Sequence, residues 1–186
     1  METVYSEFHA DCDIKIYRDP YPESPDEFSD DSLFLISHHR DFWVQRKGWS
    51  EENLKNKDYF FAPIEAYIHS GISLWFACEG NFPDRRWDVS QVGYIAVKRS
   101  SFGEGGKPAP DERCKEIAKS LLEEWNAYLD GRVFMYTVRH IGTGDEETCG
   151  GFYDDKWDGS SACLPDARST AEALKRYADR ESLVSA

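Results

Sequence analysis

Several residues of the chain have the types that catalysis uses. His69, Ser70 and Asp88 together supply the base, the nucleophile and the carboxylate of a serine hydrolase. A serine nucleophile usually sits on a strained turn such as Gly-x-Ser-x-Gly, whereas Ser70 has a glycine on one side only. Neighbouring residues of a strand also point to opposite faces, which separates His69 from Ser70. We therefore expect Ser70-Gly71 to form a bend between two strands rather than part of an active site.

The remaining histidines, cysteines and glycine-rich loops do not complete a site either. His38 and His39 alternate faces on an expected strand, and no spaced cysteine or carboxylate completes a tetrahedral metal site. Cys149 is a candidate nucleophile, but the sequence shows no environment that would activate it. The loops GTGDEET and FGEGG lack the Lys-Ser/Thr of a phosphate cradle. We therefore predict a protein without metal or cofactor that is not an enzyme.

Acidic residues dominate the chain, and they are concentrated in two segments. Of 186 residues, 35 are acidic and 22 are basic, which gives a formal net charge of −13. Residues 1–37 contain 10 acidic and 2 basic residues, and residues 133–166 contain 7 and 2. A field of this sign repels nucleic acid and attracts basic protein surfaces. The charge thus argues against direct binding of nucleic acid, although an acidic surface can also serve solubility alone.

The same composition predicts a cytoplasmic protein that does not contact a membrane. No run approaches the roughly 18 apolar residues that a membrane span needs. The acidic N-terminus lacks the basic and apolar regions of a signal peptide. Five scattered cysteines without a Cys-x-x-Cys pair favour reduced thiols over a disulfide framework.

Two acidic clusters are the strongest candidate for a binding surface. Carboxylates spaced along a rigid surface can imitate a row of phosphates and occupy a channel rich in Arg and Lys. Exposed aromatic residues such as Tyr21, Phe28 or Trp157 would supply the holding energy. The alternative is that both clusters are only solvated loops. The predicted partner-binding residues are Glu23, Asp26, Glu27, Phe28, Asp30, Asp31, Asp145, Glu146, Glu147, Asp154 and Asp155.

Hydrophobic periodicity predicts the elements that position these clusters. Alternation and apolar runs predict strands, with a turn between the last two. An apolar face that includes Cys114, Leu121 and Trp125 predicts an amphipathic helix at 111–129, capped by Asp111 and ended by Gly131. Ser50 begins a short helix, and Ser169 caps a C-terminal helix at 169–183. The expected strands are 11–18, 33–39, 59–69, 72–77, 92–99, 132–140 and 151–155.

This order predicts an α+β fold, a mostly antiparallel sheet with one main helix, about 111–129, packed on it and a further C-terminal helix. Residues 1–155 are expected to form a single domain, and residues 156–186 a C-terminal extension with a helix. The glycine-rich stretch 100–110 is expected to be a linker.

Several short motifs give the chain a family resemblance. HSGI at 69–72, Trp-Asp at 87–88, QVGYI at 91–95 and GFY at 151–153 occur in an order and spacing that resembles a family of small, uncharacterised proteins encoded by phages and mobile elements. ESPDEF at 23–28, His39-Arg40 and EWNAYLDG at 124–131 fit the same pattern, whereas the stretch 100–110 and the tail 156–186 depart from it. The resemblance implies an accessory protein of a phage, plasmid or prophage. It implies no reaction.

Charge and resemblance together predict an inhibitor of a host defence nuclease that acts by stoichiometric binding. An anti-CRISPR protein is the first expectation and an antirestriction protein the second. The expected partner is the basic nucleic-acid-binding surface of a CRISPR effector or restriction complex in the host cytoplasm. The alternatives are a small enzyme that uses His69, Asp88 or Cys149 on a host factor, and an interaction module of the phage with no role in defence.

Overall fold

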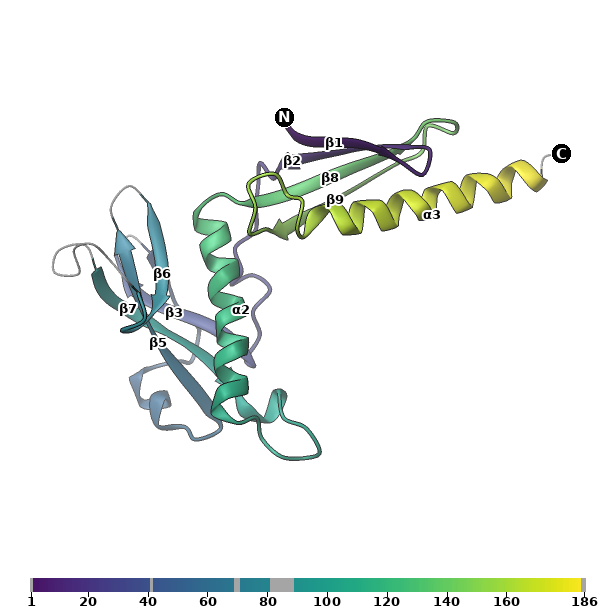
Figure 1. Ribbon diagram of the computed structural model, residues 1–186. Helices are drawn as coiled ribbons and strands as arrows, with labels where there is room; N and C mark the ends of the chain where they lie inside the picture. Colours follow the sequence, from purple (N-terminus) through teal and green to yellow (C-terminus); the bar gives the residue numbers. More distant parts are fainter. Residues whose placement is uncertain (1, 41, 69–70, 81–88, 185–186) are drawn as a thin grey trace. The chain divides into compact units, whose positions relative to one another are not determined.

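The computed structural model describes residues 2–40, 42–68, 71–80 and 89–184 (Figure 1). The chain forms two compact units, one of residues 24–130 and one that combines residues 1–23 with residues 131–186. Each unit has an antiparallel sheet and a long helix, so the predicted α+β fold is confirmed. The observed division does not coincide with the predicted boundary at residue 155, because the first 23 residues share a unit with the last 56.

The unit of residues 24–130 is built on a five-stranded sheet with the order β4-β3-β7-β5-β6. Gly93 lies at its centre, where an added Cβ would be 1.8 Å from the carbonyl oxygen of Ile36. Only a residue without a side chain therefore lets the two central strands approach. The elements are β3 (Leu33–His39), β4 (Phe42–Val44), η1 (Glu51–Lys55), β5 (Tyr59–Ile68), β6 (Ile72–Phe76), β7 (Val89–Lys98), η2 (Arg99–Ser101) and α2 (Asp111–Leu129).

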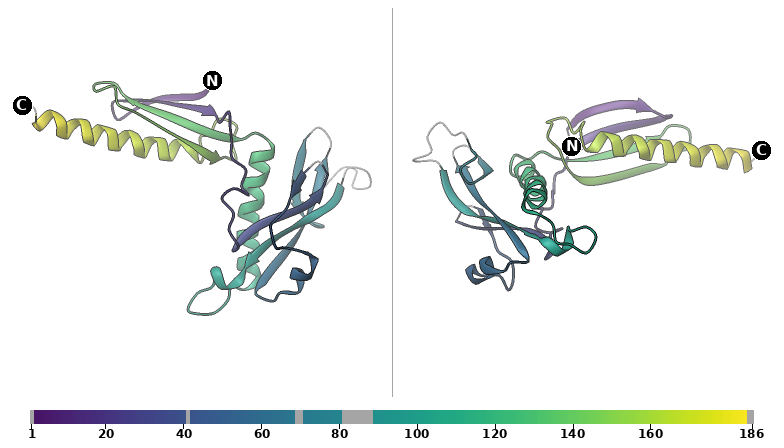
Figure 2. Two further views of the ribbon diagram at one scale, coloured as in Figure 1. Left: turned by 180° about the vertical axis from the view of Figure 1, so that it is seen from behind. Right: turned by 60° about the horizontal axis from the view of Figure 1, so that its bottom comes forward.

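The helix α2 covers one face of this sheet, as the views from behind and from below show (Figure 2). The predicted apolar face is confirmed, because Cys114, Leu121 and Trp125 are buried against the sheet. The predicted cap is wrong. Pro110 is the N-cap residue and Asp111 is the first residue of the helix, where its carboxylate pairs with Arg99 at 2.7 Å.

The opposite face of the five-stranded sheet carries an aromatic cluster. Phe34, Tyr59, Phe61 and Tyr94 extend from the strands, and Trp49 packs on them from the connection after β4. Ring centroids lie 4.6 Å apart for Phe34 and Trp49 and 4.9 Å for Trp49 and Tyr59. Because β7 is covered on both faces, its apolar density resembles that of a parallel strand although its pairings are antiparallel.

The second unit is a four-stranded sheet with the order β1-β2-β8-β9, and α3 packs along one of its faces (Figure 1). Ile14, Ile16, Phe134 and Val138 are fully buried between this sheet and the helix. None of the described helices is long and apolar enough to cross a membrane. The elements are β1 (Thr3–His9), β2 (Cys12–Arg18), β8 (Val133–His140), β9 (Glu146–Tyr153) and α3 (Cys163–Val184).

The structure corrects three predictions made from the sequence, two of them in this unit. The turn expected over 141–150 is shorter, because β9 begins at Glu146 and pairs with β8. The helix α3 begins at Cys163, six residues before the expected cap Ser169, which lies inside the helix. Pro165 stands in the first turn, where no intrahelical N–H bond is lost. The stretch 100–110 is no linker between units, since Ala109 is buried and hydrogen-bonds Arg99 within one unit.

Candidate functional site

The first acidic cluster lies on an ordered loop of residues 24–31 before β3. Two backbone bonds shape it, from the Glu27 amide to the Ser24 carbonyl at 3.0 Å and from the Ser29 amide to the Asp26 carbonyl at 3.1 Å. The Asp30 carboxylate accepts the Ser32 amide at 2.7 Å, which ends the loop in an Asx turn. The loop is therefore held in one shape by local hydrogen bonds.

Arg46 and Tyr59 attach this loop to the sheet. The Arg46 Nε lies 3.1 Å from the Asp31 carboxylate, and its guanidinium stands over the Phe34 ring at 4.9 Å. The Tyr59 hydroxyl donates to the Asp31 carbonyl at 2.9 Å. Of the four carboxylates between residues 26 and 31, that of Asp31 is thus paired within the protein before any other molecule binds.

The outer side of the loop combines charge with an aromatic ring. Glu27 and Asp30 are exposed, and Asp26 is half-buried. Phe28 between them is 64% exposed. An exposed aromatic side chain flanked by carboxylates has the composition of an interface anchor with a charged rim.

The second acidic cluster divides into residues that remain at the surface and one that does not. Asp145, Glu146 and Glu147 are exposed beside α3, where they line a groove of about 480 Å³ with Leu174 and Tyr177. The carboxylates of these three acidic residues face solvent at the turn before β9 and on the first residues of that strand.

Asp154 does not belong to this surface, which corrects the prediction. It is 2% exposed, and its carboxylate accepts the amides of Lys156, Ser161 and Ala162 at 2.8, 3.0 and 2.7 Å. These bonds shape the turn that leads into α3. Asp155 beside it is exposed, and a hydrogen bond from Ser161 lowers the pKa of its carboxyl.

The predicted residues also divide between the two compact units. Residues 26–31 belong to the unit of residues 24–130, whereas Glu23 and the cluster 145–155 belong to the other. Glu23 is exposed, and its carbonyl accepts the Tyr153 hydroxyl at 2.8 Å. The two aromatic residues named with Phe28 also lie in that second unit. Tyr21 and Trp157 are both exposed, and the guanidinium groups of Arg18 and Arg132 stand 5.2 and 5.9 Å from the centroid of the Trp157 ring.

The catalytic alternative gains no assembled site among the described residues. His69, Ser70 and Asp88 lie outside them. Cys149 is exposed on β9 opposite Tyr136. The ring of His38 packs edge-on against Trp43 with centroids 5.6 Å apart. In the part of the chain that the structure describes, no group of three His, Cys, Asp or Glu residues could hold a metal ion.

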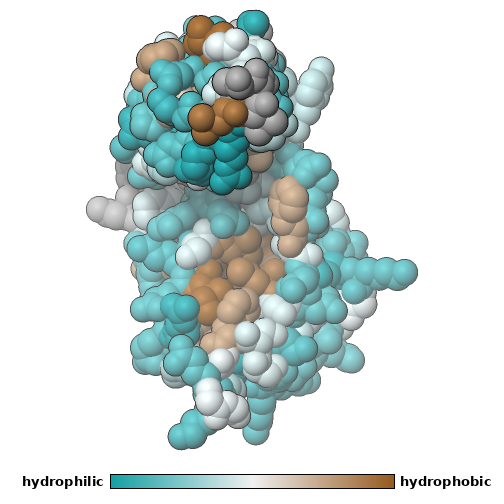
Figure 3. Space-filling model, turned by 90° about the vertical axis from the view of Figure 1, so that its right-hand side faces the viewer, coloured by the Kyte–Doolittle hydropathy of each residue, from teal (hydrophilic) through white to brown (hydrophobic). Residues whose placement is uncertain are grey.

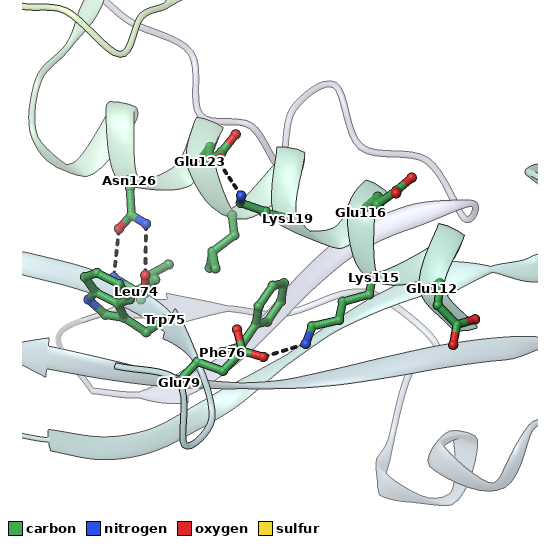
Figure 4. A pocket seen from close by; sticks show the side chains of 11 residues that line it. Leu74, Trp75, Phe76, Glu79, Glu112, Lys115, Glu116, Lys119, Glu123 and Asn126 are labelled. Carbon is green, nitrogen blue, oxygen red and sulfur yellow. Dashed lines mark hydrogen bonds and ion pairs between the residues drawn. The ribbon is translucent and has the colours of Figure 1, made fainter. Parts of the chain in front are cut away.

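The structure adds a groove that the sequence did not predict. In the space-filling view, apolar side chains gather in a patch surrounded by hydrophilic ones on the unit of residues 24–130 (Figure 3). A groove of about 610 Å³ lies between α2 and the edge strand β6 (Figure 4). Leu74, Phe76 and Leu122 form its apolar part, and charged side chains from α2 and Glu79 surround it.

No sequence signal would have joined the two sides of this groove. Its residues come from 74–79 and from 112–126, which the linear pattern leaves far apart. Leu122 gives a hint of the groove in the sequence, because it is a leucine on α2 outside the expected apolar face. It follows Leu121 directly, and consecutive residues of a helix point about 100° apart.

Comparison of the chain with protein-family models, with curated proteins and with solved structures found no match. The resemblance to proteins of phages and mobile elements therefore stays a prediction.

Proposed function

We propose that the protein inhibits a nuclease of bacterial defence by binding it stoichiometrically through its acidic surface, as an anti-CRISPR protein. The observation that carries the proposal is the ordered loop 24–31, in which the exposed Glu27 and Asp30 flank the exposed Phe28 along the chain. The partner is a basic surface that otherwise holds nucleic acid. Glu146, Glu147 and Asp155 of the other unit supply further exposed carboxylates.

The two components of this surface have different tasks. Carboxylates at the rim raise the association rate and make it depend on salt, because they act over about 8 Å at physiological ionic strength. Phe28 supplies the short-range energy, since truncating a central aromatic residue of an interface typically costs about 2 kcal/mol or more. An ordered loop also loses little conformational entropy when it binds.

The choice of a defence nuclease rests on the resemblance to proteins of phages and mobile elements. A restriction complex offers the same kind of basic channel and is the second candidate target. An enzyme acting on a host factor, or a phage interaction module without a role in defence, has no observation of its own in the described residues.

The test uses two variants that leave the internal bonds of the loop intact. Glu27→Lys with Asp30→Asn changes the charge of the loop by +3 and keeps an acceptor for the Ser32 amide. Asp31 is left unchanged because it pairs with Arg46. Phe28→Ala removes the anchor. The matched control is Glu52→Lys with Glu104→Gln, which has the same change of charge at two other exposed positions.

The measurement is recovery of CRISPR and restriction complexes on the immobilised protein from a host lysate, across a salt series, followed by nuclease assays with the recovered complex. We expect recovery by the wild type and the control, and a loss of about tenfold or more for both loop variants. Equal recovery and inhibition by wild type and loop variants would refute the role of the loop. Inhibition at far less than one protein per nuclease would favour an enzyme instead.

A further inference from the structure

A groove on the unit of residues 24–130 lies between α2 and β6, apart from the residues of the acidic loop. The helix is joined at one point to the edge strand and at another to Glu79, three residues after it, and the groove runs between these points (Figure 4). At one end the Asn126 side chain accepts a hydrogen bond from the Leu74 amide at 2.7 Å and donates one to the Leu74 carbonyl at 2.9 Å. At the other end the Lys115 ammonium pairs with Glu79 at 2.5 Å.

The floor of the groove between these two points is apolar. Leu74, Phe76 and Leu122 line it, and the Lys115 ammonium stands 6.0 Å from the centroid of the Phe76 ring. The lining residues of α2 span 112–126, which corresponds to a length of about 21 Å at 1.5 Å per residue. A groove of this volume and length accommodates a short peptide segment rather than a single side chain.

The rim of the groove is acidic. It carries four glutamates and two lysines, and both lysines already pair with rim glutamates, Lys115 with Glu79 and Lys119 with Glu123. Glu116 has Arg113 at 3.1 Å, outside the groove. Glu112 is exposed and has no ion pair among the described residues. With Arg113 counted, the carboxylates of the rim exceed its cations by one, and the excess carboxylate is Glu112 in the first turn of α2, beside the apolar floor.

We propose that this groove binds a basic amphipathic segment of another protein. Apolar side chains of the segment lie over Phe76 and Leu122, and its Lys or Arg residues pair with Glu112 and, in place of Arg113, with Glu116, whose ion pair is exposed. A basic side chain can also replace Lys115 at Glu79, because that ion pair is exposed at the surface. This inference goes beyond the proposed function, since none of the loop residues 24–31 lines the groove.

The test measures binding of three fluorescein-labelled peptides of 12 residues by fluorescence anisotropy. One peptide combines Lys and Leu in an amphipathic pattern, one has Ser in place of Leu, and one has Glu in place of Lys. The proposal expects the Lys-Leu peptide to bind at least tenfold more tightly than either of the others. Equal binding of the Lys-Ser and Lys-Leu peptides would show that the groove recognises charge alone, and it would refute the role of the apolar floor in binding.

The protein variant is Glu112→Gln with Glu116→Gln, and the matched control is Glu52→Gln with Glu104→Gln. We expect the groove variant to weaken binding of the Lys-Leu peptide by about five- to tenfold at low salt, since each exposed charge pair contributes up to about 1 kcal/mol. The control should stay within about twofold. The loop variant Glu27→Lys with Asp30→Asn should also bind this peptide normally, which separates this proposal from the proposed function.

Chemical-shift mapping of the ¹⁵N-labelled protein locates the bound peptide. Shifts at Leu74, Phe76 and Leu122 support the proposal, and shifts confined to residues 26–31 or 145–155 contradict it. Dimerisation of the wild type that Glu112→Gln with Glu116→Gln abolishes would assign the groove to a second copy of the chain. Tighter peptide binding by an Arg85→Gln and Arg86→Gln variant would assign it to residues 81–88 of the same chain. Either result would overturn the proposal.

Discussion

Replacing Asp154 by alanine should destabilise the protein more than any other change in its acidic clusters. The carboxylate is 2% exposed and accepts three backbone amides at 2.7–3.0 Å. In the Asp154→Ala variant these donors lose their partner at a site that water reaches poorly. Hydrogen bonds to a charged group contribute about 1.5–3 kcal/mol each, and three that share one acceptor do not add fully. We expect a loss of about 3 kcal/mol in the free energy of unfolding.

The assay is urea unfolding followed by circular dichroism at 222 nm. With a slope near 2 kcal/mol per molar urea, a loss of about 3 kcal/mol lowers the midpoint by roughly 1.5 M. Asp154→Asn should lie between the wild type and Asp154→Ala, because the amide keeps one acceptor oxygen. The matched control is Asp155→Ala, which removes the same charge from an exposed neighbour.

The two adjacent positions should differ strongly in their effect on stability. Asp155→Ala should change the midpoint by less than about 0.3 M, since exposed substitutions usually stay within about 0.5 kcal/mol. Asp154→Ala with the midpoint of the wild type would refute the internal role of this carboxylate. It would return Asp154 to the candidate surface residues.

Three further predictions concern the sheets, the ion pairs and the thiols. Gly93→Ala should prevent folding or lower expression strongly, because its Cβ would lie 1.8 Å from the Ile36 carbonyl oxygen. Gly71→Ala meets no atom of the described residues within 4 Å and should fold normally by circular dichroism. The Arg168 guanidinium, which donates two bonds of 2.7 Å to Glu7, lowers the pKa of that carboxyl, so the pair stabilises the fold above the unfolded pKa of about 4.3 and its contribution is lost as the pH falls. Urea midpoints of the wild type and Glu7→Gln should therefore differ at pH 7, and the difference should shrink as the pH falls below about 4.3. A difference that stays constant would contradict this. Burial raises the pKa of Cys163 to about 12, and Cys12 and Cys114 are also buried, so a thiol reagent should modify Cys78 and Cys149 rapidly and the other three only after unfolding, as mass spectrometry of timed samples can show.

The elements with strong periodicity were predictable from the sequence. The helix α2 has the expected bounds because its apolar residues recur at helical spacing and Gly131, with φ of +70°, follows its end. The strands β2 and β8 were found because alternate residues of each are buried against α3, and β3 because its residues 34–37 form a continuous buried run.

The missed elements lack that signal for physical reasons. The residues of β9 from Glu146 to Gly151 are all exposed, so the edge strand has no apolar side chains to mark it there. β1 is also an edge strand and has an irregularity between Thr3 and Tyr5 that breaks its alternation. The first turn of α3 contains Pro165, which suggests an end of helix in a sequence and is tolerated only at the start.

Charge counted along a sequence overstates the charge that a partner meets, and the two acidic clusters show where the difference arises. In a count along the sequence, Asp31 and Asp154 contribute the same charge as Glu27. In the structure Arg46 already pairs with Asp31, and the amides around the start of α3 hold Asp154 in the interior. An association rate depends on the carboxylates that no internal cation neutralises. The exposed carboxylate of Glu27, beside Phe28, therefore has more influence on a basic partner than Asp31, although both stand in the same run of sequence.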